Sequence, residues 1–511
     1  MRRGWVIALI ALLAVVLAAA NIILGDLNLD EGWYLNAALL VADGKAPYRD
    51  FFFTQAPLLP DVYALLSPLW RPFGVLGGRV VTALLGILAA LAASAAVRPA
   101  VPANRRGLAS MAVFALLACN VYHSYFTVIP KTYALASLML SLGALAISRI
   151  WGGRGWRDAL LAAAGGLAFA AAASTRLSLG IVLAVGGLFL LIDARRMKAS
   201  WFFYGIGGVL GLAAFLLHDA LGGFSGFLFA NFFHGARSGG GLAMAAGSVS
   251  RLARNYMPVA LLAATAILFR RDGFSLRAIP RLALLFVVLF ASAFVVHLLS
   301  PFPYDDYQVP AMPLLVCAVV SFALHAIPES ERMERALPIA LLIVVTLAAF
   351  TSPLNESWLV VRKDRFWVEM KQEPDIARLR RIGRKIRETT PEDSQLLTTD
   401  TYLAVEARRP VPPGFEMGAF GYFPELADDD ARAYHVLNRK LLEEVAGTCD
   451  APCAAFSGYS FALAAPAMTR IADDERDELI DIATRRYKLY VAIPDFGQEH
   501  TTLTLWRRAA Y

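Results

Sequence analysis

Long apolar runs alternate with short polar connections over the first 350 residues of the chain. Eleven apolar segments follow one another, at residues 5–24, 75–97, 108–121, 132–147, 159–173, 177–192, 201–217, 257–269, 282–299, 309–324 and 337–350. A helix that crosses a bilayer needs about 20 apolar residues, and shorter runs are accommodated by tilted or broken helices. The pattern predicts a polytopic helical membrane domain with about 11 transmembrane helices.

The polar connections between these runs fall into two alternating sets. One set is rich in Lys and Arg, at positions 2, 3, 98, 105, 106, 149, 154, 157, 195, 196, 198, 270, 271, 277, 281, 332 and 335. The other set is richer in Gly, Tyr, Phe and acidic residues. Because Lys and Arg concentrate in cytoplasmic loops, we expect a cytoplasmic N-terminus. An odd number of spans then places the tail and the loop at residues 30–58 outside.

The first apolar run has two interpretations. "MRRGWVIALIALLAVVLAAAN" has a basic start, an apolar centre and an Ala-rich end, as a cleaved signal peptide has. Its apolar part is about as long as a full membrane span. We therefore predict a retained helix, with signal-peptide cleavage as the alternative.

Composition agrees with a membrane protein. The 511 residues are 58% hydrophobic and only 17% charged, with a mean hydropathy of +0.54. The net charge of +7 does not indicate nucleic acid, because the Arg residues are spread over short loops. Cys119 and Cys317 lie in apolar runs and are expected to pack. Cys449 and Cys453 share the polar segment "TCDAPC" and can form a local disulfide in an oxidising compartment.

The tail differs from the rest of the chain. Residues 352–511 are polar enough for a separate α/β domain, with an amphipathic helix after residue 373, a helix at residues 428–447 and two late strands. Residues 400–426 are rich in aromatics and turns, and either recognise a glycan acceptor or form a packed loop. Within the membrane domain, the Gly-rich stretch at residues 235–255 predicts a mobile outer loop.

Two adjacent carboxylates follow the first span. Asp30 and Glu31 precede the helical pattern "GWYLNAALLVADG", and on a helix they point about 100° apart. A carboxylate at a membrane boundary is costly unless it is hydrated, paired or used. One of them can therefore serve as a general base that deprotonates an acceptor. The structural alternative is that Asp30 is the N-cap of the helix.

The stretch "DEGWYLNAALLVADGKAPYRDFFFTQAPLL" resembles the first outer loop of GT-C glycosyltransferases, among them the protein O-mannosyltransferase and lipid A aminoarabinose transferase families. Asp50 stands at the second acidic position, and "QAPL" replaces the "HPPL"-like turn of those families. "FGVLGGRV", at residues 73–80, resembles their entry to the second span. The resemblance implies a GT-C domain at residues 1–351, with its first outer loop at 25–74, and an extracytoplasmic α/β domain at 352–511.

In those families the loop aspartate is the catalytic base, a role that falls to Asp30 by position. The resemblance implies that Glu31 and Asp50 bind the acceptor, assist the base or hold a divalent cation. Oxygen ligands suit Mg²⁺ or Mn²⁺, and we assign no metal. Tyr48 and Gln55 of the same loop are further candidates for substrate binding.

A lipid-phosphate donor requires cations at the outer membrane boundary. Lys131 begins a span, and Arg176, in "ASTRLSLG", matches the "TKG"-like position of the aminoarabinose transferases with Arg in place of Lys. Arg79 is the third candidate for phosphate binding. The alternatives are snorkelling of Lys131 and Arg176 to the headgroups, and a role for Arg79 as an anchor at the start of its span.

The stretch "HLLSPFPYDDYQVPAMPLL" at residues 297–315 supplies the last candidates. It resembles the family's "YxxP" element, here Tyr307 to Pro310. Asp305 and Asp306 stand where relatives often carry a basic residue, which points to a different sugar or acceptor. His297 is either a substrate contact or a packing histidine.

The sequence thus predicts an inverting glycosyltransferase in the inner membrane of a bacterium. It would move a hexose or pentose from a polyprenyl-phosphate donor to a lipid, glycan or protein acceptor on the periplasmic face. A flippase for lipid-linked sugars is the alternative, although ionisable residues gather at the outer boundary rather than at mid-membrane. Hydrolysis of the lipid-linked sugar is a third possibility.

Overall fold

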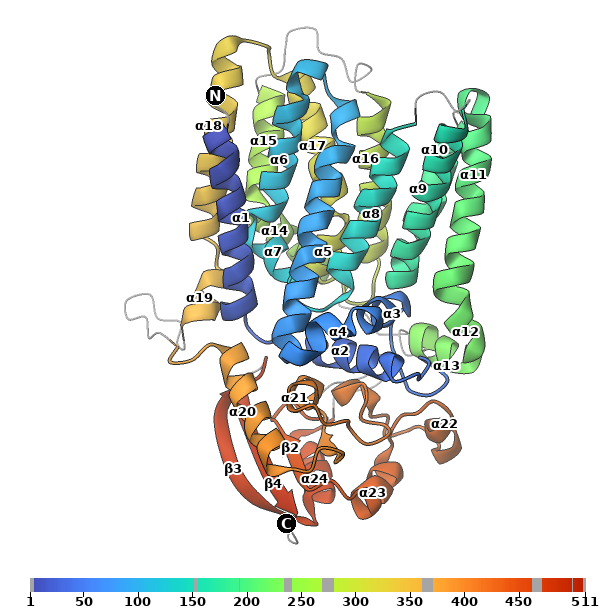
Figure 1. The fold of residues 1–511 in the computed structure, drawn as a ribbon, viewed down its shortest axis with the longest axis vertical. Helices are drawn as coiled ribbons and strands as arrows, with labels where there is room; N and C mark the ends of the chain where they lie inside the picture. The colour runs from blue at the N-terminus through green and yellow to red at the C-terminus, as the bar shows by residue number, and fades with distance from the viewer. Residues whose placement is uncertain are drawn as a thin grey trace.

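The computed structural model describes residues 4–150, 155–192, 194–233, 241–268, 280–360, 371–461, 471–498 and 500–508. A bundle of long helices forms one part of the molecule, and a smaller α/β domain is stacked on one end of it (Figure 1). Short helices lie across that end of the bundle, between the two parts.

Long apolar helices build the bundle. They are α1 (Gly4–Leu24), α5 (Gly74–Ala96), α6 (Arg106–Ala118), α8 (Thr132–Ser148), α9 (Trp156–Thr175), α10 (Gly180–Ile192), α11 (Ala194–Leu212), α15 (Met257–Leu268), α16 (Arg281–Leu298), α17 (Met312–Ala326) and α18 (Glu331–Phe350). Each predicted apolar segment overlaps one of them. Within the described residues, seven helical segments are long and apolar enough to cross a membrane. The prediction of a multi-pass membrane protein is confirmed.

Helix α5 shows why these helices suit a bilayer. Leu84, Leu88 and Leu91 are about half exposed, whereas Ala89 and Ala93 are buried against neighbouring helices. Small residues at helix contacts allow backbones to approach closely, and large apolar side chains turned outward suit lipid. The exposed leucines would be unfavourable in water but are stable against acyl chains.

The segment that follows α1 folds into short helices across the end of the bundle: α2 (Leu29–Ala42), α3 (Leu58–Leu65) and α4 (Ser67–Trp70). Asn28 is the N-cap of α2, because its side chain accepts a hydrogen bond from the Asp30 backbone N–H at 3.1 Å. Glu31 completes the capping box by accepting from the Asn28 backbone N–H at 2.9 Å. The alternative that Asp30 is the N-cap is therefore wrong.

The C-terminal domain contains a four-stranded sheet in the order β1-β2-β4-β3. Its strands are β1 (Leu396–Thr398), β2 (Cys453–Phe456), β3 (Tyr487–Phe496) and β4 (Thr501–Arg508), and its helices are α20 (Asp375–Thr389), α21 (Thr401–Ala407), α22 (Asp428–Ala433), α23 (Arg439–Thr448) and α24 (Asp473–Thr484). β1 pairs with β2 in parallel, and β4 pairs antiparallel with both β2 and β3. The predicted α/β domain is present.

Three local predictions require correction. The helix expected at residues 428–447 is two helices, because Asn438 starts α23 by accepting a hydrogen bond from the Leu441 N–H. Most of the Gly-rich stretch forms α14 (Gly241–Asn255), since Ala and Leu follow its glycines, while residues 235–240 lie outside the described part. Cys449 and Cys453 are free thiols, because Cys453 is held in the sheet and Cys449 ends α23.

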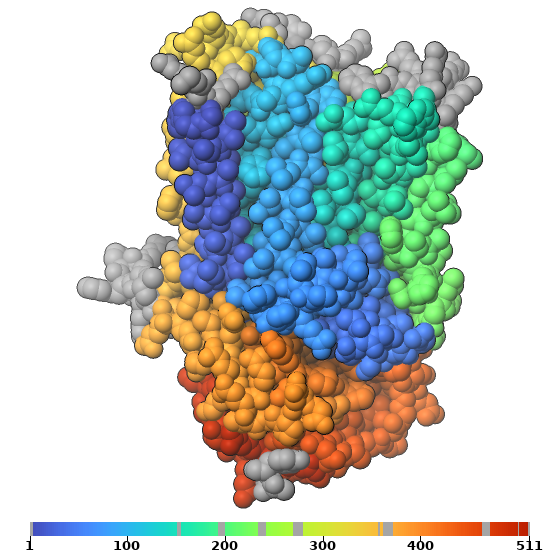
Figure 2. Space-filling view, in the orientation of Figure 1, coloured from blue at the N-terminus to red at the C-terminus, as the bar shows by residue number. Residues whose placement is uncertain are grey.

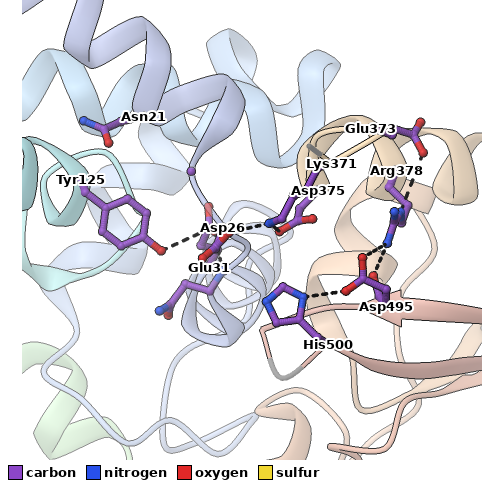
Figure 3. A network of polar contacts seen from close by, with 12 residues as sticks. Asn21, Asp26, Glu31, Tyr125, Lys371, Glu373, Asp375, Arg378, Asp495 and His500 are labelled. Atoms are coloured by element: carbon purple, nitrogen blue, oxygen red, sulfur yellow. Dashed lines mark hydrogen bonds and ion pairs between the residues drawn. The ribbon is translucent and has the colours of Figure 1, made fainter. Parts of the chain in front are cut away.

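The C-terminal domain is docked closely on the segment that contains α2. A Cβ atom at Gly32 of α2 would lie 2.2 Å from the backbone nitrogen of Tyr402, so only glycine permits this approach. The Asn36 side chain donates to the Glu416 carbonyl at 3.0 Å, and Lys371 forms an ion pair with Asp26 at 3.0 Å (Figure 3). The space-filling view shows the two parts in continuous contact (Figure 2). The domain therefore forms a fixed cover over α2.

Two buried carboxyl groups make the stability of this domain depend on pH. Burial raises the pKa of Asp400 to about 6 and that of Glu416 to about 7. Because the folded state binds these protons more tightly than the unfolded state, stability falls as pH rises from about 4 to about 7, and then stays level. A carboxylate whose pKa is lowered, such as Glu373, acts in the opposite sense: its contribution to stability is lost as the pH falls below its ordinary pKa of 4.5.

We expect the melting temperature of the full-length protein in detergent to fall by roughly 5 °C between pH 5 and pH 8. Replacing both groups, as Asp400→Asn with Glu416→Gln, should make this profile less steep, although Asp61, whose pKa burial raises to about 7, retains part of it. Thermal unfolding at a series of pH values measures it. An equally steep profile in the double variant would contradict the assignment.

Candidate active site

Asp30 lies at the start of α2 with its carboxylate held from two sides. Oδ2 is 2.7 Å from Nζ of Lys131, the residue that precedes α8. Oδ1 accepts a hydrogen bond from Nε1 of Trp33 at 3.1 Å. The Asp30 side chain is 24% exposed, so it is oriented by its partners and still accessible to a ligand. A carboxylate in this state can accept a proton from a bound molecule.

Lys131 joins Asp30 to a second carboxylate from a distant part of the chain. Its Nζ is 3.6 Å from Oδ2 of Asp306, which begins the 3₁₀ segment η8 (Asp305–Ala311) with Asp305. The same oxygen accepts a hydrogen bond from the hydroxyl of Tyr133 at 2.9 Å. The start of α2, the start of α8 and η8 therefore meet, and they bring together three residues that the sequence predicts for the site.

Arg176 lies between α9 and the 3₁₀ segment η4 (Leu177–Leu179), beside the same group. Its guanidinium carbon is 4.3 Å from the centre of the Tyr307 ring and 5.5 Å from that of Tyr133. Within the described part of the chain, no carboxylate forms an ion pair with Arg176, and its buried Nε has no hydrogen-bond partner. The aromatic faces stabilise the cation but leave its donors available to an anion.

Asp305 and His297 border this group. Asp305 accepts hydrogen bonds from the hydroxyl of Tyr122 at 2.8 Å and from Nε of Arg251 at 3.0 Å. Nε2 of His297 is 3.0 Å from the hydroxyl of Ser178, and the buried imidazole packs near the Tyr307 ring. The geometry therefore favours the interpretation of His297 as a packing histidine that contacts the Tyr307 ring.

Glu31 and Arg79 form a closed ion pair away from Asp30. Two hydrogen bonds of 2.6 Å join the guanidinium to the carboxylate, and both side chains are 0% exposed. The remaining Arg79 donors bond the carbonyls of Ile22, Gly25 and Asp26 at the end of α1. The pair fastens α1, α2 and α5 together, so the geometry favours the anchor alternative for Arg79.

Asp50, Tyr48 and Gln55 belong to a turn after α2. Asp50 forms an ion pair with Arg49, whose Nη2 donates a hydrogen bond to Oδ2 of Asp50 at 2.7 Å. The hydrogen bond from Arg49 lowers the pKa of Asp50 to about 2, so Asp50 is a weak base. The buried Tyr48 donates its hydroxyl hydrogen to the carbonyl of Gln55. These bonds form within the turn, separately from those of Asp30 and Lys131.

The space between the carboxylates of Asp30 and Asp306 is occupied by the ammonium group of Lys131. Nζ of Lys131 lies between the two carboxylates, at the position that a divalent cation would need to bridge them. Among the described residues, no three His, Cys, Asp or Glu side chains are grouped to hold a metal ion. The residues therefore fit a lysine-linked pair of carboxylates better than a metal centre.

Two residues of the site escape the sequence analysis. Trp33 orients Asp30, and Tyr133 contacts Asp306 while its ring faces both Lys131 and Arg176. Tyr133 follows Lys131 by two residues, so proximity to a candidate cation was an available signal. Trp33 has the one-turn spacing from Asp30 that places both on one face of α2.

The bundle of apolar helices with its docked α/β domain makes this chain a multi-pass membrane protein, and its fold is that of GT-C glycosyltransferases. Two crystal structures of ArnT from Cupriavidus metallidurans, a lipid A aminoarabinose transferase, match it end to end. The structure bound to undecaprenyl phosphate is 13% identical, with 99% of this chain and 98% of that chain covered and a TM-score of 0.62. The apo structure is 14% identical, with 98% of each chain covered and a TM-score of 0.59.

A looser likeness links the chain to an oligosaccharyltransferase. AglB from Archaeoglobus fulgidus, in complex with an inhibitory peptide and a dolichol-phosphate, is 10% identical, with 90% of this chain and 70% of that chain covered and a TM-score of 0.47. No protein-family model and no curated protein sequence matches the chain. The likeness to the two ArnT structures confirms the predicted GT-C fold with a C-terminal domain.

Proposed function

We propose that this protein is an inverting glycosyltransferase that uses a polyprenyl-phosphate-linked sugar. The acceptor is a hydroxyl or amine of a lipid, glycan or protein. One observation carries the proposal. An accessible carboxylate, Asp30, and Arg176, a cation with no carboxylate partner among the described residues, belong to one connected group at the end of the bundle. A base for the acceptor and a cation for the donor phosphate are the two groups that this reaction requires.

The reaction needs little covalent chemistry from the protein. Asp30 takes the proton of the acceptor while the acceptor oxygen or nitrogen attacks the anomeric carbon of the sugar. The bond from that carbon to the phosphate oxygen breaks, and the lipid phosphate leaves with the electron pair. Attack from the face opposite the phosphate inverts the anomeric configuration. Arg176 donates to the phosphate and stabilises the charge that develops on it.

Lys131 contributes to the base and to the donor site. Its ammonium group lies between Asp30 and Asp306, and the 2.7 Å ion pair holds the Asp30 carboxylate in place for the acceptor. Nζ of Lys131 also lies 5.1 Å from the centre of the Tyr133 ring, which faces Arg176. A donor phosphate on Arg176 therefore gains a second positive charge nearby.

The comparison with ArnT supports the class of donor. The similar ArnT structure is bound to undecaprenyl phosphate, a polyprenyl phosphate. Asp305 and Asp306 add negative charge beside the proposed donor site of this chain. We therefore propose that the sugar or acceptor carries hydroxyl or amino groups, which carboxylates recognise as hydrogen-bond donors.

The distribution of charge supports the orientation in the membrane. The basic connection at Arg105 packs against the end of α17 through carbonyls of Leu324 and Ile327, at the end of the bundle away from the C-terminal domain. The connections at residues 151–154 and 269–279 lie outside the described residues. With basic loops in the cytoplasm, the site and the C-terminal domain face the periplasm of a bacterial inner membrane.

Sugar transfer in isolated membranes tests the proposal. Membranes containing the protein are supplied with radiolabelled polyprenyl-phosphate sugars and a native lipid extract. We expect label to move from the donor to a new glycoside. Release of free sugar would instead support hydrolysis. Movement of intact donor across the bilayer, without a new glycoside, would support the flippase alternative.

Removing the charge of Arg176 is expected to weaken donor binding. In Arg176→Gln, the loss of a charge-assisted contact to phosphate should raise the KM for the donor roughly 10- to 100-fold. Arg176→Lys keeps the charge but loses stacking on Tyr307, so a smaller increase is expected. Arg254→Gln, at an exposed position of α14, is the matched control. An unchanged KM in Arg176→Gln would contradict the phosphate role.

A further inference from the structure

A basic cleft lies where the C-terminal domain meets the start of a membrane-spanning helix. It is lined by Phe73, Arg380, Arg384, Arg387, Glu406 and Arg408, together with the backbone next to Phe73. Three of the arginines project from α20, and Arg408 follows α21. Phe73 ends the 3₁₀ segment η1 (Arg71–Phe73), directly before α5. The cleft therefore joins both parts of the molecule.

Positive charge exceeds negative charge in this cleft. Glu406 is the single carboxylate among the lining residues, against four arginines. Its Oε1 is 3.7 Å from Nε of Arg380, and its Oε2 accepts from the Val75 N–H at 3.1 Å. Arg384 is exposed, and within the described part of the chain it has no ion pair. Several guanidinium donors are thus available to an anion.

The cleft lies at the end of a helix that is long and apolar enough to span a membrane. Gly74 begins α5, which belongs to a segment long and apolar enough to cross the membrane. In the short helices just before α5, Leu65, Leu69 and Phe73 are 81%, 65% and 57% exposed, and Phe73 also lines the cleft. Arginines at the end of a span, next to exposed apolar side chains, match the phosphate and the acyl chains of one lipid molecule.

We propose that this cleft binds the phosphate of an anionic phospholipid in the leaflet next to the C-terminal domain. The arginines of α20 hold the phosphate, and Phe73 with its apolar neighbours contacts the acyl chains. The cleft shares no residue with the group around Asp30 and Arg176, so the lipid is neither donor nor acceptor of the sugar. Bound lipid ties the C-terminal domain to the bilayer surface.

Lipid binding to the full-length protein tests this site. The purified protein in detergent is titrated with phosphatidylglycerol or phosphatidylcholine, and bound lipid is counted by native mass spectrometry. We expect preference for phosphatidylglycerol, and a roughly 30-fold weaker affinity in Arg384→Gln with Arg387→Gln. Arg381→Gln is the control, because Arg381 lies on the same helix but is 61% exposed and paired with Glu373.

The outcomes separate a lipid site from a general attraction of anions. The proposal would be overturned if Arg381→Gln weakened phosphatidylglycerol binding as much as the double variant does. Unchanged phosphatidylglycerol binding in the double variant would also overturn it. Inorganic phosphate that competes as well as the lipid would also overturn it, because the apolar contacts would then contribute nothing. Thermal unfolding confirms that each variant is folded, and the exposed single variant Arg384→Glu replaces the double variant if that one melts early.

Discussion

Asp30→Asn is expected to stop sugar transfer while leaving the protein folded. The amide keeps the shape of the carboxylate and can still accept the hydrogen bond of Trp33. It cannot take a proton from the acceptor. Since a positioned general base contributes about 10²- to 10⁴-fold, kcat should fall by that factor, with a small change in the KM for the donor.

Asp43→Asn is the control for Asp30→Asn. Asp43→Asn removes a carboxylate at the other end of α2. Asp43 is exposed, and its ion pair with Arg71 is long, at 3.9 Å. This control should transfer sugar normally. Thermal unfolding of both variants shows whether the loss of the Lys131 ion pair affects folding. Normal transfer by folded Asp30→Asn would show that another group is the base.

Arg79→Met is expected to destabilise the protein strongly. The substitution leaves the fully buried Glu31 charged without its partner, and it removes the donors that bond the carbonyls at the end of α1. Breaking a buried ion pair on one side costs about 3–5 kcal/mol. The melting temperature in detergent and the yield of folded protein should both fall. Arg79→Lys should rescue little, because one ammonium cannot replace the guanidinium fork.

A second substitution distinguishes an anchor from a phosphate ligand. The double variant Arg79→Met with Glu31→Gln should lose less stability than the sum of the losses in the two single variants, because it leaves no unpaired charge buried. Melting curves of the single and double variants measure this coupling. If Arg79→Met were instead as stable as the wild type but bound donor weakly, the sequence-based assignment of Arg79 to the donor phosphate would hold.

Local properties of the chain were enough to predict much of this molecule. Hydropathy identifies the spanning helices because each needs a long apolar run whatever it packs against. Counting spans placed Lys131, Arg176 and residues 305–306 at the same end as Asp30, and the structure joins them there. Alternating side chains predicted β3 and β4, since a strand's period is local.

The partners of these side chains depend on packing that no local pattern encodes. Asp306 and Tyr133 are 173 residues apart, and Arg79 and Glu31 are 48 apart. Ala and Leu also outweighed the glycines that suggested a loop at α14, once the helix packed beside η8.

Asp30 and Glu31 show the division most clearly. The sequence by pattern alone determined that a helix begins here and that its first turn carries two carboxylates pointing about 100° apart. Only the tertiary structure decided that Asp30 meets Lys131 at an accessible edge while Glu31 is sealed against Arg79. The reason is physical: whether a carboxylate is available as a base or spent in a buried ion pair depends on its surroundings in space, and those come from distant parts of the chain.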